Sequence, residues 1–261
     1  MHAQSRDNYD HYRECRAYET ALELKKEGKI RHLGISFHDT PEFLDHILTD
    51  YPEVEVVQLQ FNYLDYDDMA IASGACYEVA RKHGKPVIVM EPVKGGQLAN
   101  LPPEAEEILK ARNAGTPASY AIRYAAGFDG IMMTLSGMST IDQTLDNISF
   151  MKNFVPLDDD EKAVIDRVRD VFRSKNLVPC TGCRYCTEGC PKGIKIPDIF
   201  KVMNTKELHK DWDAEEYYKD FTAEGNRASD CIKCGQCEKV CPQHLKIRSI
   251  LEQAAEQFDK N

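Results

Sequence analysis

The chain has 261 residues, 42% hydrophobic and 29% charged, which is typical of a globular protein with one large domain and one small one. Its formal net charge of −10 argues against nucleic acid or an anionic membrane surface as a partner. No apolar run approaches the length of a membrane span, and the amino terminus is too polar for a signal peptide, so we expect a cytoplasmic location.

The front half of the chain alternates between strand-like and helical segments. Strands are expected at Ile30–Phe37, Val54–Tyr63, Val87–Val93 and Ile131–Ser136. Helices are expected at Asp10–Lys26, Thr40–Thr49, Asp67–His83, Glu104–Ala111, Ala118–Ala126 and Ile141–Met151. Strands that alternate with helices of this size indicate parallel βαβ units and therefore an α/β fold.

Polar residues gather near the ends of these strands. Ser36, Glu91 and Ser136 close three of them, while Gln58 and Asn62 share one face of the remaining strand, because side chains alternate along a strand. Polar groups at the carboxyl ends of parallel strands mark the active face of a (β/α)8 barrel or the crevice of an open sheet. Capping of strand ends explains any single residue equally well. The recurrence across four strands is what favours a site.

Four strands are half of what a closed eight-stranded barrel requires. Half a barrel would leave unpaired edges at Ile30–Phe37 and Ile131–Ser136, so either the first half is missing, another chain completes it, or the sheet is open. A helix with an acidic first turn is expected at Leu157–Lys175 and leads to a cysteine-rich end. We therefore expect a partial barrel at residues 1–156, a connecting helix at 157–179 and a second domain at 180–261.

Eight of the ten cysteines lie in two copies of one motif, CTGCRYCTEGCP at Cys180–Pro191 and CIKCGQCEKVCP at Cys231–Pro242. The shared spacing, C-x2-C-x2-C-x3-C-P, is typical of bacterial proteins that hold two [4Fe–4S] clusters, each of which needs four thiolates. Zinc is the main competitor, but four cysteines in eleven residues, twice, exceed what a zinc ribbon needs. The expected metal ligands are Cys180, Cys183, Cys186, Cys190, Cys231, Cys234, Cys237 and Cys241.

Helical periodicity at Ile199–Leu208 and Ala214–Phe221, between the two motifs, favours a mostly α-helical domain that resembles α-helical ferredoxins. Paired motifs of this kind usually exchange their last cysteine. The expected ligand sets are therefore Cys180, Cys183, Cys186 and Cys241 for one cluster and Cys231, Cys234, Cys237 and Cys190 for the other. The remaining cysteines, Cys15 and Cys76, and the single tryptophan, Trp212, are expected to be buried in cores.

Four segments together resemble the second half of an aldo-keto reductase barrel. They are EGKIRHLGISFHD (Glu27–Asp39), VVQLQFNYLD (Val56–Asp65), VIVMEPVKGGQL (Val87–Leu98) and LSGMSTIDQTLDN (Leu135–Asn147). With the cysteine motifs after them, their order resembles the iron–sulfur-containing branch of that family. The resemblance implies the C-terminal half of a (β/α)8 TIM barrel followed by a ferredoxin-like two-cluster domain.

The resemblance also implies NADPH, bound across the carboxyl face of the barrel without a Rossmann glycine fingerprint. The matching positions are Ser36 and Gln58 near the nicotinamide, Glu91, Pro92, Val93, Lys94 and Gly95 along the ribose and pyrophosphate, and Gly137, Ser139, Gln143, Asp146 and Asn147 on the adenosine side. Backbone amides of glycines can approach phosphate oxygens closely. The alternatives are an exposed loop lysine for Lys94 and a plain polar helix face for the residues from Gln143 to Asn147.

This sequence departs from the family in one way that limits which of the family's catalytic residues it contains. The family reduces carbonyls with a tyrosine as proton donor, supported by lysine, aspartate and histidine, and the first three come from the half of the barrel that has no counterpart here. Only His2 matches, at the position of the family's histidine, and its catalytic role requires an upstream half, in which case Met1 is an internal methionine.

Two functions follow as hypotheses. The first is the carboxyl half of an NADPH-dependent reductase that acts on a small carbonyl or alcohol substrate and carries two [4Fe–4S] clusters. The second is an electron-transfer iron–sulfur protein whose barrel remnant is non-catalytic. NADPH delivers two electrons as a hydride whereas each cluster takes one, so the first hypothesis calls for a redox partner protein or for clusters that are structural.

Overall fold

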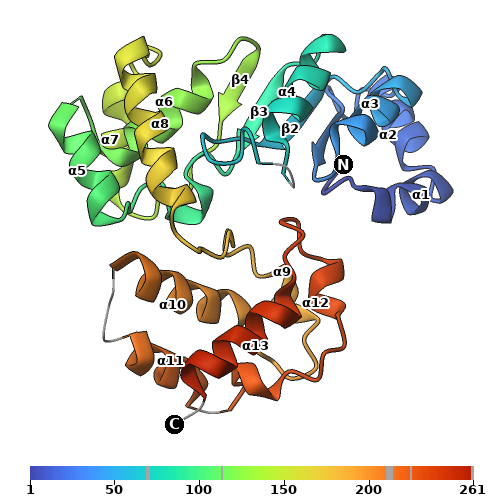
Figure 1. The fold of residues 1–261 in the computed structure, drawn as a ribbon. Helices are drawn as coiled ribbons and strands as arrows, with labels where there is room; N and C mark the ends of the chain where they lie inside the picture. Colours follow the sequence, from blue (N-terminus) through green and yellow to red (C-terminus); the bar gives the residue numbers. More distant parts are fainter. Residues whose placement is uncertain (69–70, 113, 210–213, 224, 260–261) are drawn as a thin grey trace. The chain divides into compact units, whose positions relative to one another are not determined.

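The computed structural model describes residues 1–261 except 69–70, 113, 210–213, 224 and 260–261 (Figure 1). The chain forms two compact units, which are described separately below. The half-barrel unit comprises Met1–Lys94 and Gly115–Ile165, and the cysteine unit comprises Gly95–Ala114 and Asp166–Asn261.

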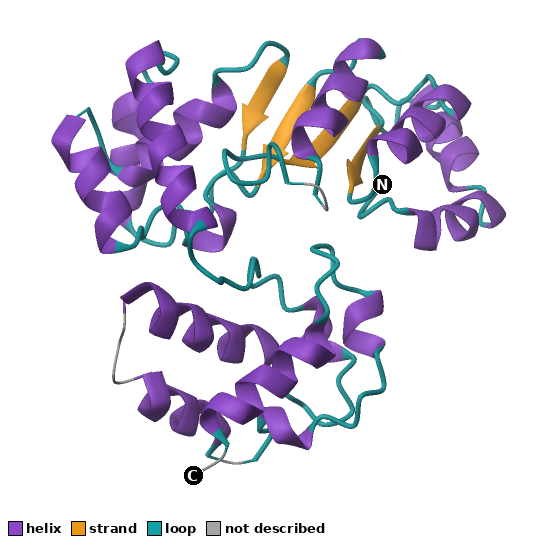
Figure 2. Ribbon diagram, viewed as in Figure 1, coloured by secondary structure: helices purple, strands orange, loops and turns teal. Residues whose placement is uncertain are grey.

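The half-barrel unit is built on a four-stranded parallel sheet with the strand order β1-β2-β3-β4 (Figure 2). Its strands are β1 (Gly34–Phe37), β2 (Val56–Gln60), β3 (Val87–Met90) and β4 (Ile131–Thr134). Its helices are α1 (Arg6–Glu14), α2 (Ala17–Lys26), α3 (Pro41–Asp50), α4 (Ser73–Lys82), α6 (Pro117–Ala126) and α7 (Ile141–Met151), followed by α8 (Asp159–Arg173). The four expected strands and the parallel βα order are confirmed.

The helix expected over Asp10–Lys26 is wrong, because the chain forms two helices there. Arg16 adopts a left-handed conformation (φ 53°) between α1 and α2 and breaks the helical path. Cys15 caps the end of α1 and is exposed, so its predicted burial is also wrong. The sequence carries no glycine or proline at this break, which is why apolar spacing alone predicted one continuous helix.

The outer edge of β1 is covered by the amino terminus of the chain. Gln4 forms a parallel bridge with Phe37, and its N–H donates to the carbonyl O of Ser36 (2.7 Å), while Ser36 N–H donates to the carbonyl O of Met1 (3.0 Å). Gln4 is fully buried and accepts a hydrogen bond from Tyr18 Oη at 2.7 Å. The expected exposed edge at Ile30–Phe37 is therefore wrong, because four residues of the chain already pair with it.

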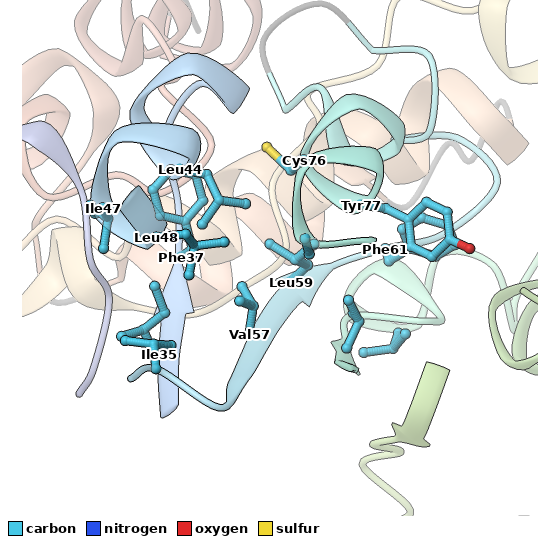
Figure 3. Packing of buried hydrophobic residues seen from close by; sticks show 14 of the residues in the cluster. Ile35, Phe37, Leu44, Ile47, Leu48, Val57, Leu59, Phe61, Cys76 and Tyr77 are labelled. Atoms are coloured by element: carbon cyan, nitrogen blue, oxygen red, sulfur yellow. The ribbon is translucent and has the colours of Figure 1, made fainter. Parts of the chain in front are cut away.

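One face of the sheet packs against α3 and α4 to form the main core (Figure 3). The labelled core side chains are Ile35, Phe37, Leu44, Ile47, Leu48, Val57, Leu59, Phe61, Cys76 and Tyr77. The strand residues alternate, as the period of two requires, so β1 and β2 each turn apolar side chains toward the helices. Cys76 is 2% exposed, which confirms its predicted burial.

The β4 edge is different, because β4 and α7 leave large apolar side chains exposed. We call this surface the open face, and its residues are Met132, Met133, Leu135, Met138, Ile141, Leu145, Ile148, Met151, Phe154 and Val155. Within the described part of the half-barrel unit, every large hydrophobic residue that is exposed belongs to it, and α7 has no buried residue. Parallel sheets normally have both faces covered, so this surface has the composition of an interior.

The cysteine unit is helical. Its helices are α5 (Pro103–Arg112), α9 (Tyr185–Glu188), α10 (Ile196–His209), α11 (Ala214–Thr222), α12 (Gln236–Lys239) and α13 (Ile247–Phe258), with one 3-10 turn at Ala228–Asp230 and another, Lys94–Gly96, at its boundary. α10, α11 and α13 pack around buried residues that include Phe200, Tyr218 and Leu251. The two helices expected between the motifs are thus confirmed as α10 and α11. The prediction for Trp212 lies outside the described residues.

The cysteine unit contains an internal structural repeat. Cys231 follows Cys180 at an interval of 51 residues, and the same interval relates α9 to α12 and α10 to α13. Left-handed backbone conformations recur at matching positions, at Gly182 and Lys233 for instance. In the described residues, no helix is both long and apolar enough to cross a membrane.

Candidate metal centres and cofactor loop

Four cysteines line a first cavity in the cysteine unit, which is partly open to solvent and has an empty volume of about 310 Å³ including that open space. We call them the first cysteine site, Cys180, Cys183, Cys186 and Cys241. The apolar side chains of Ile196, Phe200, Leu245 and Ile247 complete the lining. Three of the cysteines come from one motif and the fourth from the other, so the structure brings together one of the two predicted ligand sets.

Four other cysteines line a second cavity of about 320 Å³. They form the second cysteine site, Cys190, Cys231, Cys234 and Cys237. Its apolar lining includes Ile194, Ile196, Ile232 and Leu251. The two cavities have nearly equal volumes and mirror one another in ligand origin, as expected for a duplicated motif that exchanges its last cysteine.

Local sequence explains why three cysteines of each motif point to one cavity. Arg184 and Gly235 adopt left-handed conformations (φ 68° and 78°) and start the short helices α9 and α12. These helices bury the third cysteine of each motif, Cys186 and Cys237. In each motif, seven residues therefore supply three of the cysteines that line one cavity.

Burial makes these thiols poor acids in the absence of a bound cation. Desolvation raises the pKa of Cys180 to about 11, with further contributions from the nearby Cys183 and Cys241. It likewise raises the pKa of Cys186 to about 12 and that of Cys237 to about 11. A bound metal supplies the positive charge that deprotonates a coordinating thiol, so the donor set fits a metal group rather than a free reactive thiol.

The number of cysteines in each site matches the donor set of an iron–sulfur cluster. Four cysteines line each cavity, and one [4Fe–4S] cluster needs four thiolates. Among the residues that the structure describes, no three histidine, cysteine, aspartate or glutamate side chains approach closely enough to hold one metal ion. A single zinc ion would require four thiolates at about 2.3 Å from a common centre.

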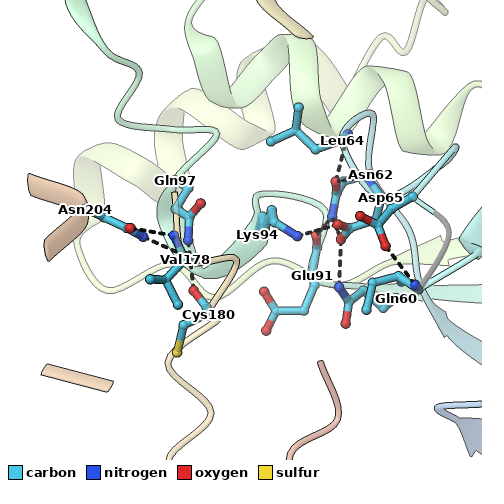
Figure 4. A network of polar contacts seen from close by, with 12 residues as sticks. Gln60, Asn62, Leu64, Asp65, Glu91, Lys94, Gln97, Val178, Cys180 and Asn204 are labelled. Carbon is cyan, nitrogen blue, oxygen red and sulfur yellow. Dashed lines mark hydrogen bonds and ion pairs between the residues drawn. The ribbon is translucent and has the colours of Figure 1, made fainter. Parts of the chain in front are cut away.

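At the carboxyl ends of β2 and β3, a closed polar network surrounds Asp65 (Figure 4). Its carboxylate pairs with Lys94 and accepts hydrogen bonds from Gln60 Nε2 and Asn62 Nδ2, each at 2.6 Å. Asn62 also donates to the carbonyl O of Glu91 at 3.0 Å. Lys94 is 3% exposed, so the alternative of an exposed loop lysine is wrong. The network anchors the loop after β3, and it gives Lys94 a counter-charge within the protein.

The loop Glu91–Gly96 has a largely left-handed backbone. Glu91 and Lys94 have φ values of 57° and 48°, and Gly95 and Gly96 follow with 61° and 92°. Such conformations are unfavourable for residues with a side chain, so the Asp65 network and the hydrogen bond from Lys94 N–H to Glu91 O (3.1 Å) must hold them. Successive amides in this geometry form a concave surface of the kind that binds anions.

Two predicted nicotinamide-side residues lie on neighbouring strands, and the predicted catalytic residue lies beside one of them. Ser36 of β1 and Gln58 of β2 are register partners in the sheet. Ser36 Oγ accepts a hydrogen bond from Ala3 N–H (2.7 Å) and lies 3.5 Å from Nδ1 of His2. Gln58 Nε2 contacts the sulfur of Met90 at 3.3 Å. The amino-terminal strand pairing thus brings His2, which is exposed, to the carboxyl end of the sheet.

The predicted adenosine-side residues lie on α7 or just before it, and they are Gly137, Ser139, Gln143, Asp146 and Asn147. Gln143 Oε1 accepts a hydrogen bond from Ser139 N–H (2.7 Å) and closes a capping box at the start of α7. Asn147 Nδ2 donates to Ser136 Oγ at 2.8 Å. These contacts give the residues a local structural role, and their role toward a nucleotide stays a prediction.

Sequence reasoning missed the side chains that hold the first cysteine loop within the cysteine unit (Figure 4). Gln97 Nε2 donates to the carbonyl O of Cys180 at 2.8 Å. Asn204 of α10 forms two hydrogen bonds with the backbone of Val178. Its Oδ1 accepts from Val178 N–H (2.8 Å), and its Nδ2 donates to Val178 O (2.7 Å). Gln97 lies in the family-like segment Val87–Leu98, but no signal in the sequence indicates that it or Asn204 contacts the cysteine loop.

Comparison with known proteins agrees with this geometry. The family model described as "Aldo/keto reductase family" matches residues 6–170, well over half of the chain. The chain belongs to the aldo/keto reductase family. A second family model, "4Fe-4S dicluster domain", matches residues 179–245 of this aldo/keto reductase chain and so includes all eight motif cysteines. The fold is therefore the carboxyl half of a (β/α)8 barrel followed by a helical iron–sulfur domain.

Solved structures similar to this aldo/keto reductase chain include aldo-keto reductase AKR11C1 from Bacillus halodurans in its holo form, at 24% identity and a TM-score of 0.46 over 64% of this chain and 58% of that one. Another is an aldo-keto reductase from Klebsiella pneumoniae in complex with NADPH, at 19% identity and a TM-score of 0.47 over 58% of this chain and 52% of that one. The chain thus spans little more than half the length of these proteins. No match was found among curated protein sequences.

Proposed function

We propose that this chain is the carboxyl part of an NADPH-linked reductase for a small carbonyl or alcohol substrate, and that it carries two [4Fe–4S] clusters. The observation that supports the proposal most strongly is the pair of four-cysteine cavities in a chain of the aldo/keto reductase family. The ligands of one cluster are the first cysteine site and those of the other are the second cysteine site. When bound, each cluster supplies one-electron redox chemistry.

The nucleotide site of the proposal lies at the carboxyl ends of the strands. Ser36 and Gln58 face the nicotinamide, the loop Glu91–Gly95 follows the pyrophosphate, and the residues from Gly137 to Asn147 hold the adenosine side. The left-handed amides of Gly95 and Gly96 support this assignment, because they have no side chains that would keep phosphate oxygens away. Lys94, paired with Asp65, shapes the loop and adds a partly compensated positive charge.

The proposal also includes a second half of the barrel, supplied by residues outside this sequence. The open face supports this, because ten large apolar side chains beside an unpaired parallel strand need βα units that continue the sheet. A lipid surface would leave the backbone groups of the β4 edge without partners. The missing half would bring the tyrosine, lysine and aspartate of the family's chemistry to His2, so this sequence alone is expected to bind NADPH weakly and to reduce nothing.

A second candidate function is electron transfer by an iron–sulfur protein in which the barrel remnant is non-catalytic. The internal completeness of the two cysteine sites favours it, because each already has four cysteines without any further polypeptide. Both candidates fit a cytoplasmic protein, and the first calls for a separate redox partner, since a hydride carries two electrons and each cluster accepts one.

Titration of the anaerobically purified protein with NADPH separates the two candidates. Calorimetry that detects binding below about 1 mM, and loses it in Gly96→Val, supports the reductase, because a valine side chain would cover the amide of residue 96. Gly84→Val, at another glycine with a left-handed backbone (φ 67°) that lies outside this loop, is the matched control and is expected to keep the affinity. No binding at millimolar NADPH would favour the electron-transfer function.

A further inference from the structure

The segment that follows Lys94 packs directly on the first cysteine loop. Gly95 is so close to Thr181 that an added Cβ would lie 2.5 Å from the Thr181 carbonyl O, well inside van der Waals contact. Two residues later, Gln97 is half-buried and donates from Nε2 to the carbonyl O of Cys180 at 2.8 Å. Both contacts lie within the cysteine unit. The carbonyl of the first ligand of this site and the residue that follows it are therefore held by residues 95–97.

Lys94, the residue before this segment, is anchored elsewhere. Its ammonium group is buried against Asp65 in the polar network of the half-barrel unit. The chain therefore passes from one unit to the other between Lys94 and Gly95. A ligand that binds the amides of Gly95 and Gly96 acts on the same segment that holds the first cysteine loop through Gln97.

The second cysteine site is held in another way. Cys231 N–H donates to the carbonyl O of Ala228 (3.3 Å), and Arg248 of α13 is hydrogen-bonded to Glu238 of α12 and to the carbonyl O of Lys233 (3.5 Å). All of these partners lie within the second half of the repeat. The two sites are alike in cysteines and cavity volume, but the loop after β3 contacts the first site and not this set of partners.

We propose that Gln97 is a positioning residue through which the segment of residues 95–97 controls the first cysteine site and leaves the second unaffected. The proposal rests on the proposed function for its metal group and its nucleotide, and it adds a direction of coupling that the family assignment does not contain. Gln97 acts on the backbone of Cys180 and therefore on how firmly that ligand is held.

The test is the rate at which iron leaves the anaerobically purified protein in the presence of a chelator. Wild-type protein is expected to release iron in two phases, one for each site. Gln97→Ala, and the isosteric Gln97→Glu, which lacks a donor, are expected to accelerate one phase about fivefold, since a neutral hydrogen bond contributes about 1 kcal/mol and 1.36 kcal/mol is a factor of ten in rate. Asn100→Ala is the matched control, because Asn100 is exposed and its side chain bonds within its own turn, to Gly96 O.

A variant that lacks one site assigns the accelerated phase. In a Cys183→Ala background, which removes a ligand of the first site only, Gln97→Ala is expected to leave the remaining iron release unchanged. Acceleration of both phases in the wild-type background, acceleration in the Cys183→Ala background, or no acceleration at all would overturn the assignment to Gln97.

Saturating NADP⁺ tests the coupling itself, with binding measured independently by calorimetry. The nucleotide is expected to slow the first-site phase in the wild type and to lose that effect in Gln97→Ala. Binding of NADP⁺ without any change in the first-site phase would overturn the coupling. Absence of NADP⁺ binding would contradict the proposed function instead, while site-specific acceleration in Gln97→Ala would still support the positioning role of Gln97.

Discussion

Replacement of Lys94 by methionine is expected to destabilise the half-barrel unit, because it leaves the Asp65 carboxylate buried without its cation. The side chains of Lys94 and Asp65 are 4% and 2% exposed. Removal of one partner of a buried ion pair costs about 3–5 kcal/mol, and the two amides that still donate to Asp65 place the expected loss at about 3 kcal/mol. Each kcal/mol lowers the melting temperature of a domain of this size by roughly 2–4 °C, so we expect a fall of roughly 6–12 °C.

Thermal unfolding of the anaerobically purified protein, followed by near-ultraviolet circular dichroism of its tyrosines, measures this change. Lys82→Met is the matched control, because Lys82 also pairs with a carboxylate, Asp45 at 3.0 Å, but its side chain is 69% exposed, so a change below about 0.5 kcal/mol is expected. The double variant Lys94→Met/Asp65→Asn is expected to regain part of the loss, because a neutral amide removes the unpaired buried charge while its Oδ1 can still accept from Gln60 and Asn62. The reasoning would be refuted if the Lys94→Met protein, like the control, melted within about 2 °C of the wild type. A shift of that size corresponds to a loss of no more than about 1 kcal/mol, at roughly 2–4 °C per kcal/mol.

Three further predictions concern packing, association and pH. Gly95→Ala is expected to loosen the first cysteine loop and speed its iron release more than tenfold, because the new Cβ meets Thr181 O and φ is +61°; an unchanged rate would contradict the close approach. Ile148→Lys on the open face is expected to reduce self-association in sedimentation velocity, since Ile148 is 51% exposed, whereas unchanged association would mean that the open face is not responsible. The pKa of Glu55 is lowered to about 2, first by Lys25, so its stabilising effect is present above the ordinary value of about 4.3 and is lost as pH falls toward 2. The difference in melting temperature between wild type and Glu55→Gln should therefore shrink as the pH falls from 5 to 2. A difference that stays constant over this range would contradict the prediction.

The parts of the fold that were predictable are those with a short-range pattern. The strand at Val87–Met90 is a compact apolar run, and the fixed spacing of the cysteine motifs predicted which cysteines line each cavity. The turn at Arg16 was not predictable, because an arginine gives no signal for a left-handed conformation. The pairing of Met1–Gln4 with β1 was missed for a related reason, since a segment of only four residues, two of them apolar, does not resemble a strand.

The candidate sites, like the fold, contain some groupings that a sequence motif predicts and other contacts that it does not. The grouping of Cys180 with Cys241 followed from the motif, because the exchange of the last cysteine is a property of the repeat. The pairing of Lys94 with Asp65 and the contact of Gln97 with Cys180 join residues 29 and 83 positions apart, and only the folded chain brings them together. Single side chains that position a loop carry no periodicity, so these contacts had to be found in the structure.

The most direct test of the account is the iron and acid-labile sulfide content of the anaerobically purified chain. Two four-cysteine sites predict about eight iron and eight sulfide per chain. Cys241→Ala is expected to remove the iron of the first cysteine site and Cys190→Ala that of the second, each leaving about four iron. Zinc in place of iron, clearly fewer than about eight iron in the wild type, or loss of both clusters in each variant would contradict the two separate sites on which the account depends.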